Sequence, residues 1–179
     1  MTSKTTRQLT DVVRDLAQTA RVIHSKADKL SFGRNDLLAH LYRACSLSES
    51  YGEQFLALDG LAHQLLKHQM YHEAAKVSGY ALELLNGIHA LPLDGPEVLL
   101  AHCYLLAKHS HASSNCGDFS AVIKADQELG RALMAALRCG ADIPATKPGM
   151  NGLVDHMVIS TCASPIPLLL TYSAAAEHA

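Results

Sequence analysis

The sequence has no tryptophan and few aromatic residues of any kind, which together make up 5% of its 179 residues. Charged residues are also scarce, at 18% against a usual value of roughly 25%. Few aromatic side chains disfavour a sheet-rich fold, and low charge with 49% hydrophobic residues excludes disorder over most of the chain. The abundant residues are leucine (28) and alanine (26), which are strong helix formers. The composition therefore predicts an all-α protein.

Several functional classes are disfavoured by what else is missing. The net charge is −2, and this near-neutral balance gives no electrostatic reason to expect nucleic-acid binding. The sequence contains no clean run of about 18 apolar residues, so we expect no membrane span. The first residues lack the apolar core of a secretory signal. The five cysteines are odd in number, widely spaced and without a CxxC motif, so we expect no disulfide framework and a cytoplasmic location.

Hydrophobic spacing predicts six helices, over residues 6–30, 36–47, 51–68, 71–88, 97–111 and 119–138. In the first, apolar residues form a seam with a period of 3.5 residues. The seam consists of Leu9, Val13, Leu16, Ala20, Ile23, Ala27 and Leu30. Asn35 and Asp118 are expected to cap the second and sixth helices. The segment Ser113–Gly117 is expected to be a loop.

The chain changes character after the sixth predicted helix. Residues 141–152 are rich in proline and glycine and predict a linker. Residues 153–179 are apolar, and a long exposed apolar segment would be an aggregation liability. We therefore expect a helical domain over 1–140 and a linker with an apolar C-terminal tail, 141–179, that folds back and packs on the domain.

One segment carries a recognisable repeat pattern. Bulky and small residues alternate through two predicted helices at Leu58, Leu61, Ala62, Tyr71, Ala74 and Ala81. Small residues at such spacing let two helices approach closely. The segment 55–88 resembles a tetratricopeptide repeat, and 97–138 resembles a degenerate second copy. The resemblance implies a tetratricopeptide-like α-solenoid of about three stacked antiparallel helix pairs.

In that family the first helix of a pair lines a concave groove that holds a partner peptide or helix. By this resemblance the groove residues are Leu56, Asp59, His63, Leu66 and Lys67. Asp59 and His63 do not reproduce the Lys/Asn carboxylate clamp of chaperone-tail-binding members. The chain is also similar to small bacterial secretion chaperones. The resemblance thus implies a non-enzymatic scaffold or chaperone whose partner is another protein, with homodimerisation left open.

The alternative is a small-molecule or metal-responsive regulator that uses the His/Cys-rich region 102–116. Its candidate ligands are Cys103, His109, His111 and Cys116, since zinc accepts thiolates and imidazoles. Their spacing matches no familiar zinc pattern, so we expect no metal and no cofactor. No nucleophile, phosphate-loop or dinucleotide motif is present, and no enzymatic activity is expected.

Overall fold

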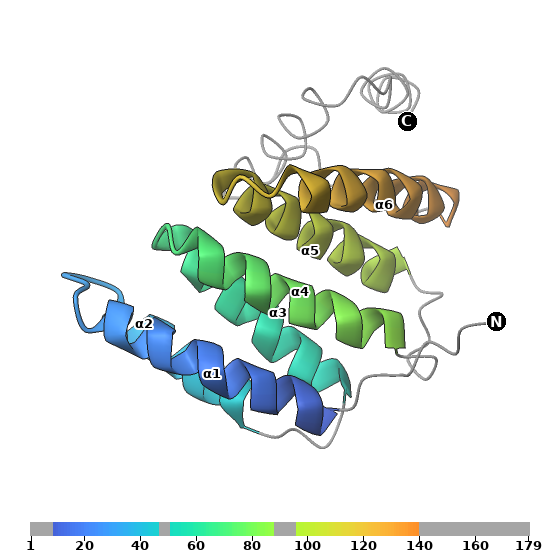
Figure 1. The fold of residues 1–179 in the computed structure, drawn as a ribbon. Coiled ribbons are helices and arrows are strands. Elements are labelled where there is room, and N and C mark those ends of the chain that lie inside the picture. The colour runs from blue at the N-terminus through green and yellow to red at the C-terminus, as the bar shows by residue number, and fades with distance from the viewer. Residues whose placement is uncertain (1–8, 47–50, 88–95, 140–179) are drawn as a thin grey trace. The chain divides into compact units, whose positions relative to one another are not determined.

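A computed structural model describes residues 9–46, 51–87 and 96–139 (Figure 1). Its elements are α1 (Leu9–Ala27), α2 (Arg34–Cys45), α3 (Tyr51–Lys67), α4 (Tyr71–Gly87), α5 (Pro96–Asn115) and α6 (Phe119–Arg138). All regular secondary structure in these ranges is helical, which confirms the all-α prediction. Among these six helices, none combines the length and the hydrophobicity that a membrane span requires.

The chain divides into two compact units between Leu93 and Asp94. The first unit contains α1 to α4, and the described part of the second contains α5 and α6. The predicted linker and apolar tail, 141–179, lie outside the described residues. The stacking of three helix pairs as a solenoid stays a prediction.

In the first unit the helices pack in chain order, and α4 also packs against α1. Each of the four helices therefore has two principal neighbours. Their facing sides supply the core, which consists mainly of leucine: Leu16, Ile23, Leu37, Leu41, Leu58, Leu61, Leu65 and Leu84 are fully buried. Burial of each such side chain contributes roughly 1.5–3 kcal/mol to the free energy of folding.

The buried stripe of α1 differs from the predicted seam. Val12 and Thr19 are buried, whereas Val13 and Ala20 of the predicted seam are only half-buried. A straight α-helix repeats every 3.6 residues, so a seam read at 3.5 residues drifts around its surface. The shift leaves Ala20 at the edge of the core.

Two turns at the helix ends differ from the prediction. Asn35 does not cap α2, because the helix begins at Arg34 after Gly33, which has φ of 70°. The predicted loop 113–117 is wrong over its first three residues, since α5 continues to Asn115. Gly117, with φ of 75°, ends the helix, and its N–H donates to the Ser114 carbonyl in the manner of a Schellman cap.

The second unit is built on the antiparallel pair α5 and α6. The predicted cap of α6 is confirmed, because the Ala121 N–H donates to Asp118 Oδ1 at 3.1 Å. Between the two helices, the buried Ser110 hydroxyl donates to Asp126 Oδ1 at 2.6 Å. Leu105, Leu106 and Leu129 fill the surrounding core.

Candidate functional site

The five predicted groove residues lie on one side of α3. Their spacing of three or four residues places Leu56, Asp59, His63, Leu66 and Lys67 along one helix face. Leu56 is 61% exposed, and His63 and Lys67 are exposed as well. The core residues Leu58, Leu61 and Leu65 are on the opposite side of the helix. The structure thus brings the five together, and their partner-binding role stays a prediction.

The four candidate metal ligands of region 102–116 are not gathered into a group that could hold a metal ion. Cys103 is buried, whereas Cys116 is exposed at the end of α5. Burial raises the pKa of the Cys103 thiol to about 11, which opposes formation of the thiolate that zinc binds. Throughout the described ranges, no three His, Cys, Asp or Glu side chains are positioned to share an ion.

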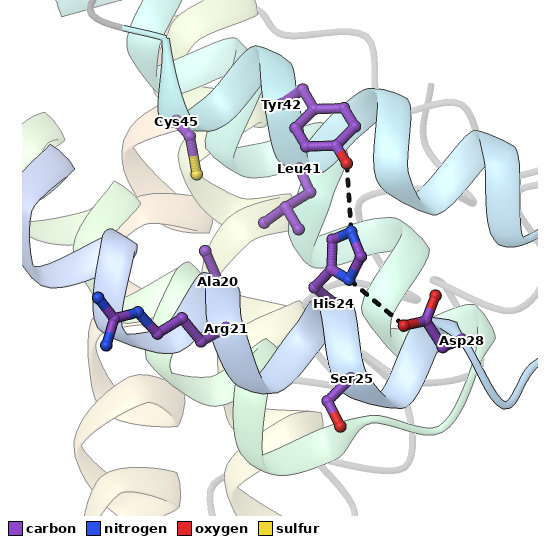
Figure 2. Close-up of a pocket in the computed structure, with 8 residues that line it drawn as sticks. All are labelled: Ala20, Arg21, His24, Ser25, Asp28, Leu41, Tyr42 and Cys45. Carbon is purple, nitrogen blue, oxygen red and sulfur yellow. Dashed lines mark hydrogen bonds and ion pairs between the residues drawn. The ribbon is translucent and has the colours of Figure 1, made fainter.

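A surface hollow between α1 and α2 is the candidate site that sequence reasoning missed (Figure 2). It has a volume of about 560 Å³ and opens to solvent. It is lined by Ala20, Arg21, His24, Ser25, Asp28, Leu41, Tyr42 and Cys45. The lining residues of α1 are spaced by about four residues, as are those of α2, so each helix contributes one face.

The hollow combines an apolar floor with a polar rim. Leu41 is buried and Ala20 half-buried, and together they present hydrocarbon at the centre (Figure 2). Tyr42 is 57% exposed and stands at the rim, as does the exposed Arg21. A surface of this kind can hold an apolar side chain while it offers hydrogen-bond donors to the groups beside it.

A chain of polar contacts crosses the rim. Tyr42 Oη lies 3.3 Å from His24 Nε2, and His24 Nδ1 lies 3.5 Å from Asp28 Oδ2. Arg34 donates to Asp28 Oδ1 through Nη2 at 2.7 Å and through Nε at 3.1 Å. These hydrogen bonds from Arg34 are the largest cause of the lowered pKa of Asp28. The negative charge of the Asp28 carboxylate is therefore balanced by the guanidinium of Arg34.

Cys45 supplies the one thiol that lines the hollow, and this thiol is not activated. Partial burial raises the pKa of Cys45, so the thiol remains protonated at neutral pH. Since the thiolate is the nucleophilic form, Cys45 is not activated for covalent catalysis. The lining is therefore suited to binding, and its geometry supports no specific chemical step.

Part of this hollow could have been found in the sequence. His24 and Asp28 are four residues apart in a predicted helix, so their contact follows from helical geometry. Tyr42 and Cys45 reach the same place only because α2 packs against α1. That packing depends on the turn between the helices and leaves no local signal in the sequence.

Comparison of the chain with family models, with curated proteins and with solved structures gives no match. The resemblance to tetratricopeptide repeats is therefore neither supported nor contradicted from outside the chain.

Proposed function

We propose that the chain is a non-enzymatic interaction module that holds a peptide or helix of another protein. The observation that carries the proposal is the hollow between α1 and α2, where the exposed Tyr42 stands beside the apolar floor at Leu41. Tyrosine and arginine are enriched among the residues that dominate the energy of protein interfaces. The hollow supplies both, at Tyr42 and Arg21.

The chemistry of the hollow suits a side chain flanked by polar groups. An apolar side chain of the partner would displace water from Leu41 and Ala20 and bury hydrocarbon there, at roughly 25 cal/mol per Å². Arg21 and Ser25 are exposed at the rim and can donate hydrogen bonds to carbonyl or carboxylate oxygens of the partner. A mixed surface of this kind favours a short segment over a small apolar molecule.

The exposed face of α3 is the second contact surface in the proposal. Leu56 is the exposed leucine of this face, and His63 and Lys67 are exposed beside it. The resemblance to tetratricopeptide repeats supports the same face. By that resemblance the module is a scaffold or a chaperone, and a secretion-associated role in the cytoplasm extends the proposal.

The regulator hypothesis receives less support from the geometry. Cys103 is buried with a raised pKa, and among the described residues no group of potential ligands surrounds it. The region 102–116 therefore carries no metal-binding proposal.

Capture of partners from a native lysate, followed by identification and a titration with the purified partner, tests the proposed function. We expect the pair Arg21→Ala and Tyr42→Ala to lower the affinity by at least tenfold. Both side chains are exposed, so the fold should survive, and circular dichroism checks this. The matched control is Lys29→Ala, which removes an exposed cation of the first unit outside the hollow.

A second pair of variants separates the two surfaces. If Asp59→Lys with His63→Ala abolishes binding while the hollow variants have no effect, the partner binds to α3 and the hollow is not the site. If neither pair changes the affinity for the captured partner, both surfaces are wrong. If no protein is captured in an amount comparable to that of the chain, the proposal of an interaction module is wrong.

A further inference from the structure

An apolar stripe on α6 is left open to solvent. Phe119 is 68% exposed, Ile123 is 60% exposed, and Met134 is exposed as well. Helical geometry at 100° per residue places all three within about 60° of one another, together with Gly130. We call these three side chains the α6 stripe. Large apolar side chains gathered on one face indicate a surface that another element covers.

The α6 stripe borders the side of α6 that packs on α5 but is not part of it. Leu129 and Ala136 are buried and are turned well away from Ile123 around the helix. The stripe therefore remains after the pairing of α5 and α6 is complete. It extends for about 22 Å along the helix, from Phe119 to Met134.

The sequence supplies a segment of matching chemistry a short distance after this helix. Residues 153–172 contain a single charged side chain, Asp155, and many large aliphatic ones. Residues 140–152 join this segment to the end of α6 and can span up to about 40 Å. The 20-residue helix is about 30 Å long, so the connection can return the segment to any point of the stripe.

We propose that the α6 stripe is the docking surface for this chain's own segment 153–172. The segment would bury its aliphatic side chains on Phe119, Ile123 and Met134, and the apolar surface of both would leave water together. A tethered segment needs little intrinsic affinity, because its effective concentration near the stripe reaches the millimolar range. This inference concerns a different surface from the proposed function and does not depend on it.

Thiol protection in the full-length chain tests the docking. The variant Ile123→Cys places a thiol in the stripe, and Lys124→Cys places one on the exposed side of the same helix turn as a matched control. Pulsed alkylation with N-ethylmaleimide, read by peptide mass spectrometry, measures each thiol separately. We expect labelling at position 123 to be at least tenfold slower than at position 124.

The occupant is identified by a change in the segment. In the Ile123→Cys chain, changing Leu168, Leu169 and Leu170 together to Ser should remove the protection. The labelling rate at position 123 should then equal the rate measured at position 124 in the Lys124→Cys variant. Equal labelling at both positions in the parent full-length variants overturns the proposal. Protection that grows with protein concentration, together with a dimer in light scattering, assigns the stripe to a second copy and also overturns it. Protection that survives the leucine changes in a monomer overturns it as well.

Discussion

The imidazole of His68 occupies the space that a side chain on Gly33 would need. A β-carbon built on Gly33 would lie 2.7 Å from the His68 ring, closer than side chains tolerate. Gly33 precedes α2 with φ of 70°, and His68 follows the last residue of α3. The contact therefore joins the turn between α1 and α2 to the end of α3.

The Gly33→Ala change should lower the free energy of unfolding by about 2–3 kcal/mol. It combines left-handed backbone strain with the clash against His68. Gly117→Ala is the matched control, because Gly117 has φ of 75° but open space around it, and it should cost about 1 kcal/mol. Urea unfolding measures both. If the two variants lose equal stability, the contact with His68 imposes no packing constraint.

The contact between Lys26 and Glu73 should make a measurable contribution to the packing of α1 on α4. Lys26 Nζ lies 2.7 Å from Glu73 Oε1, and the Glu73 side chain is 4% exposed. Lys26→Met would leave a buried carboxylate without its cation and should cost about 1–2 kcal/mol, since the half-exposed lysine is partly screened by water. Pairing it with Glu73→Gln should recover most of that loss.

A double-mutant cycle on the Lys26 and Glu73 variants, by thermal or urea unfolding, gives the coupling energy. Arg14→Met is the control, because its ion pair with Asp11 is exposed and lies within α1. A Lys26→Met variant no less stable than the Arg14→Met control would show that the ion pair between Lys26 and Glu73 contributes nothing.

The pair of Ser110 and Asp126 predicts a pH dependence of stability. Burial raises the pKa of Asp126, while the hydrogen bond from Ser110 lowers it by less. A raised pKa in the folded state means that this group stabilises the fold below its usual value of 3.8, and that this stabilisation is lost as the pH rises through the raised pKa.

The Asp126→Asn change should remove this pH dependence. Its amide oxygen still accepts from Ser110, so at pH 7 we expect the variant to be at least as stable as the parent. Urea unfolding at pH 4 and pH 7 measures the difference, and Ser110→Ala should enlarge the loss on going to pH 7. Parallel pH profiles for the parent and Asp126→Asn would contradict the assignment.

The cysteines should differ sharply in reactivity. Cys116 and Cys139 are exposed, whereas Cys103 is buried with its pKa raised to about 11. Brief treatment with N-ethylmaleimide at pH 7 should modify Cys116 and Cys139 and leave Cys103 intact. Peptide mass spectrometry reads each site, and urea provides the control in which Cys103 becomes reactive. Rapid modification of Cys103 without urea would mean that α5 is not packed as described.

Helix positions were predictable where local chemistry is strong. The bounds of α6 match the prediction because Asp118 both interrupts the apolar pattern and caps the next helix. The end of α5 was not predictable in the same way. Serine and asparagine at 113–115 favour a loop when taken alone, yet Ser113 is buried and the helix continues to the Gly117 cap.

The candidate sites differ in the same way, because some lie within one helix and one lies between two helices. The α3 face from Leu56 to Lys67 depends on residues three and four apart in one helix, so the sequence contains it. The hollow of Tyr42, His24 and Cys45 joins two helices, and a sequence contains no distance between helices. The four candidate ligands near Cys103 are close in sequence and are still not gathered around an ion.

By itself the sequence determined that the described ranges of this chain are helical and where most of those helices lie. Those properties depend on propensity and on a period of 3.6 residues, which act within a few residues along the chain. Only the tertiary structure decided that Gly33 meets His68, that Glu73 is buried beside Lys26, and that a hollow opens between α1 and α2. Such contacts depend on how several helices share one core, because each side chain's surroundings come from distant parts of the chain.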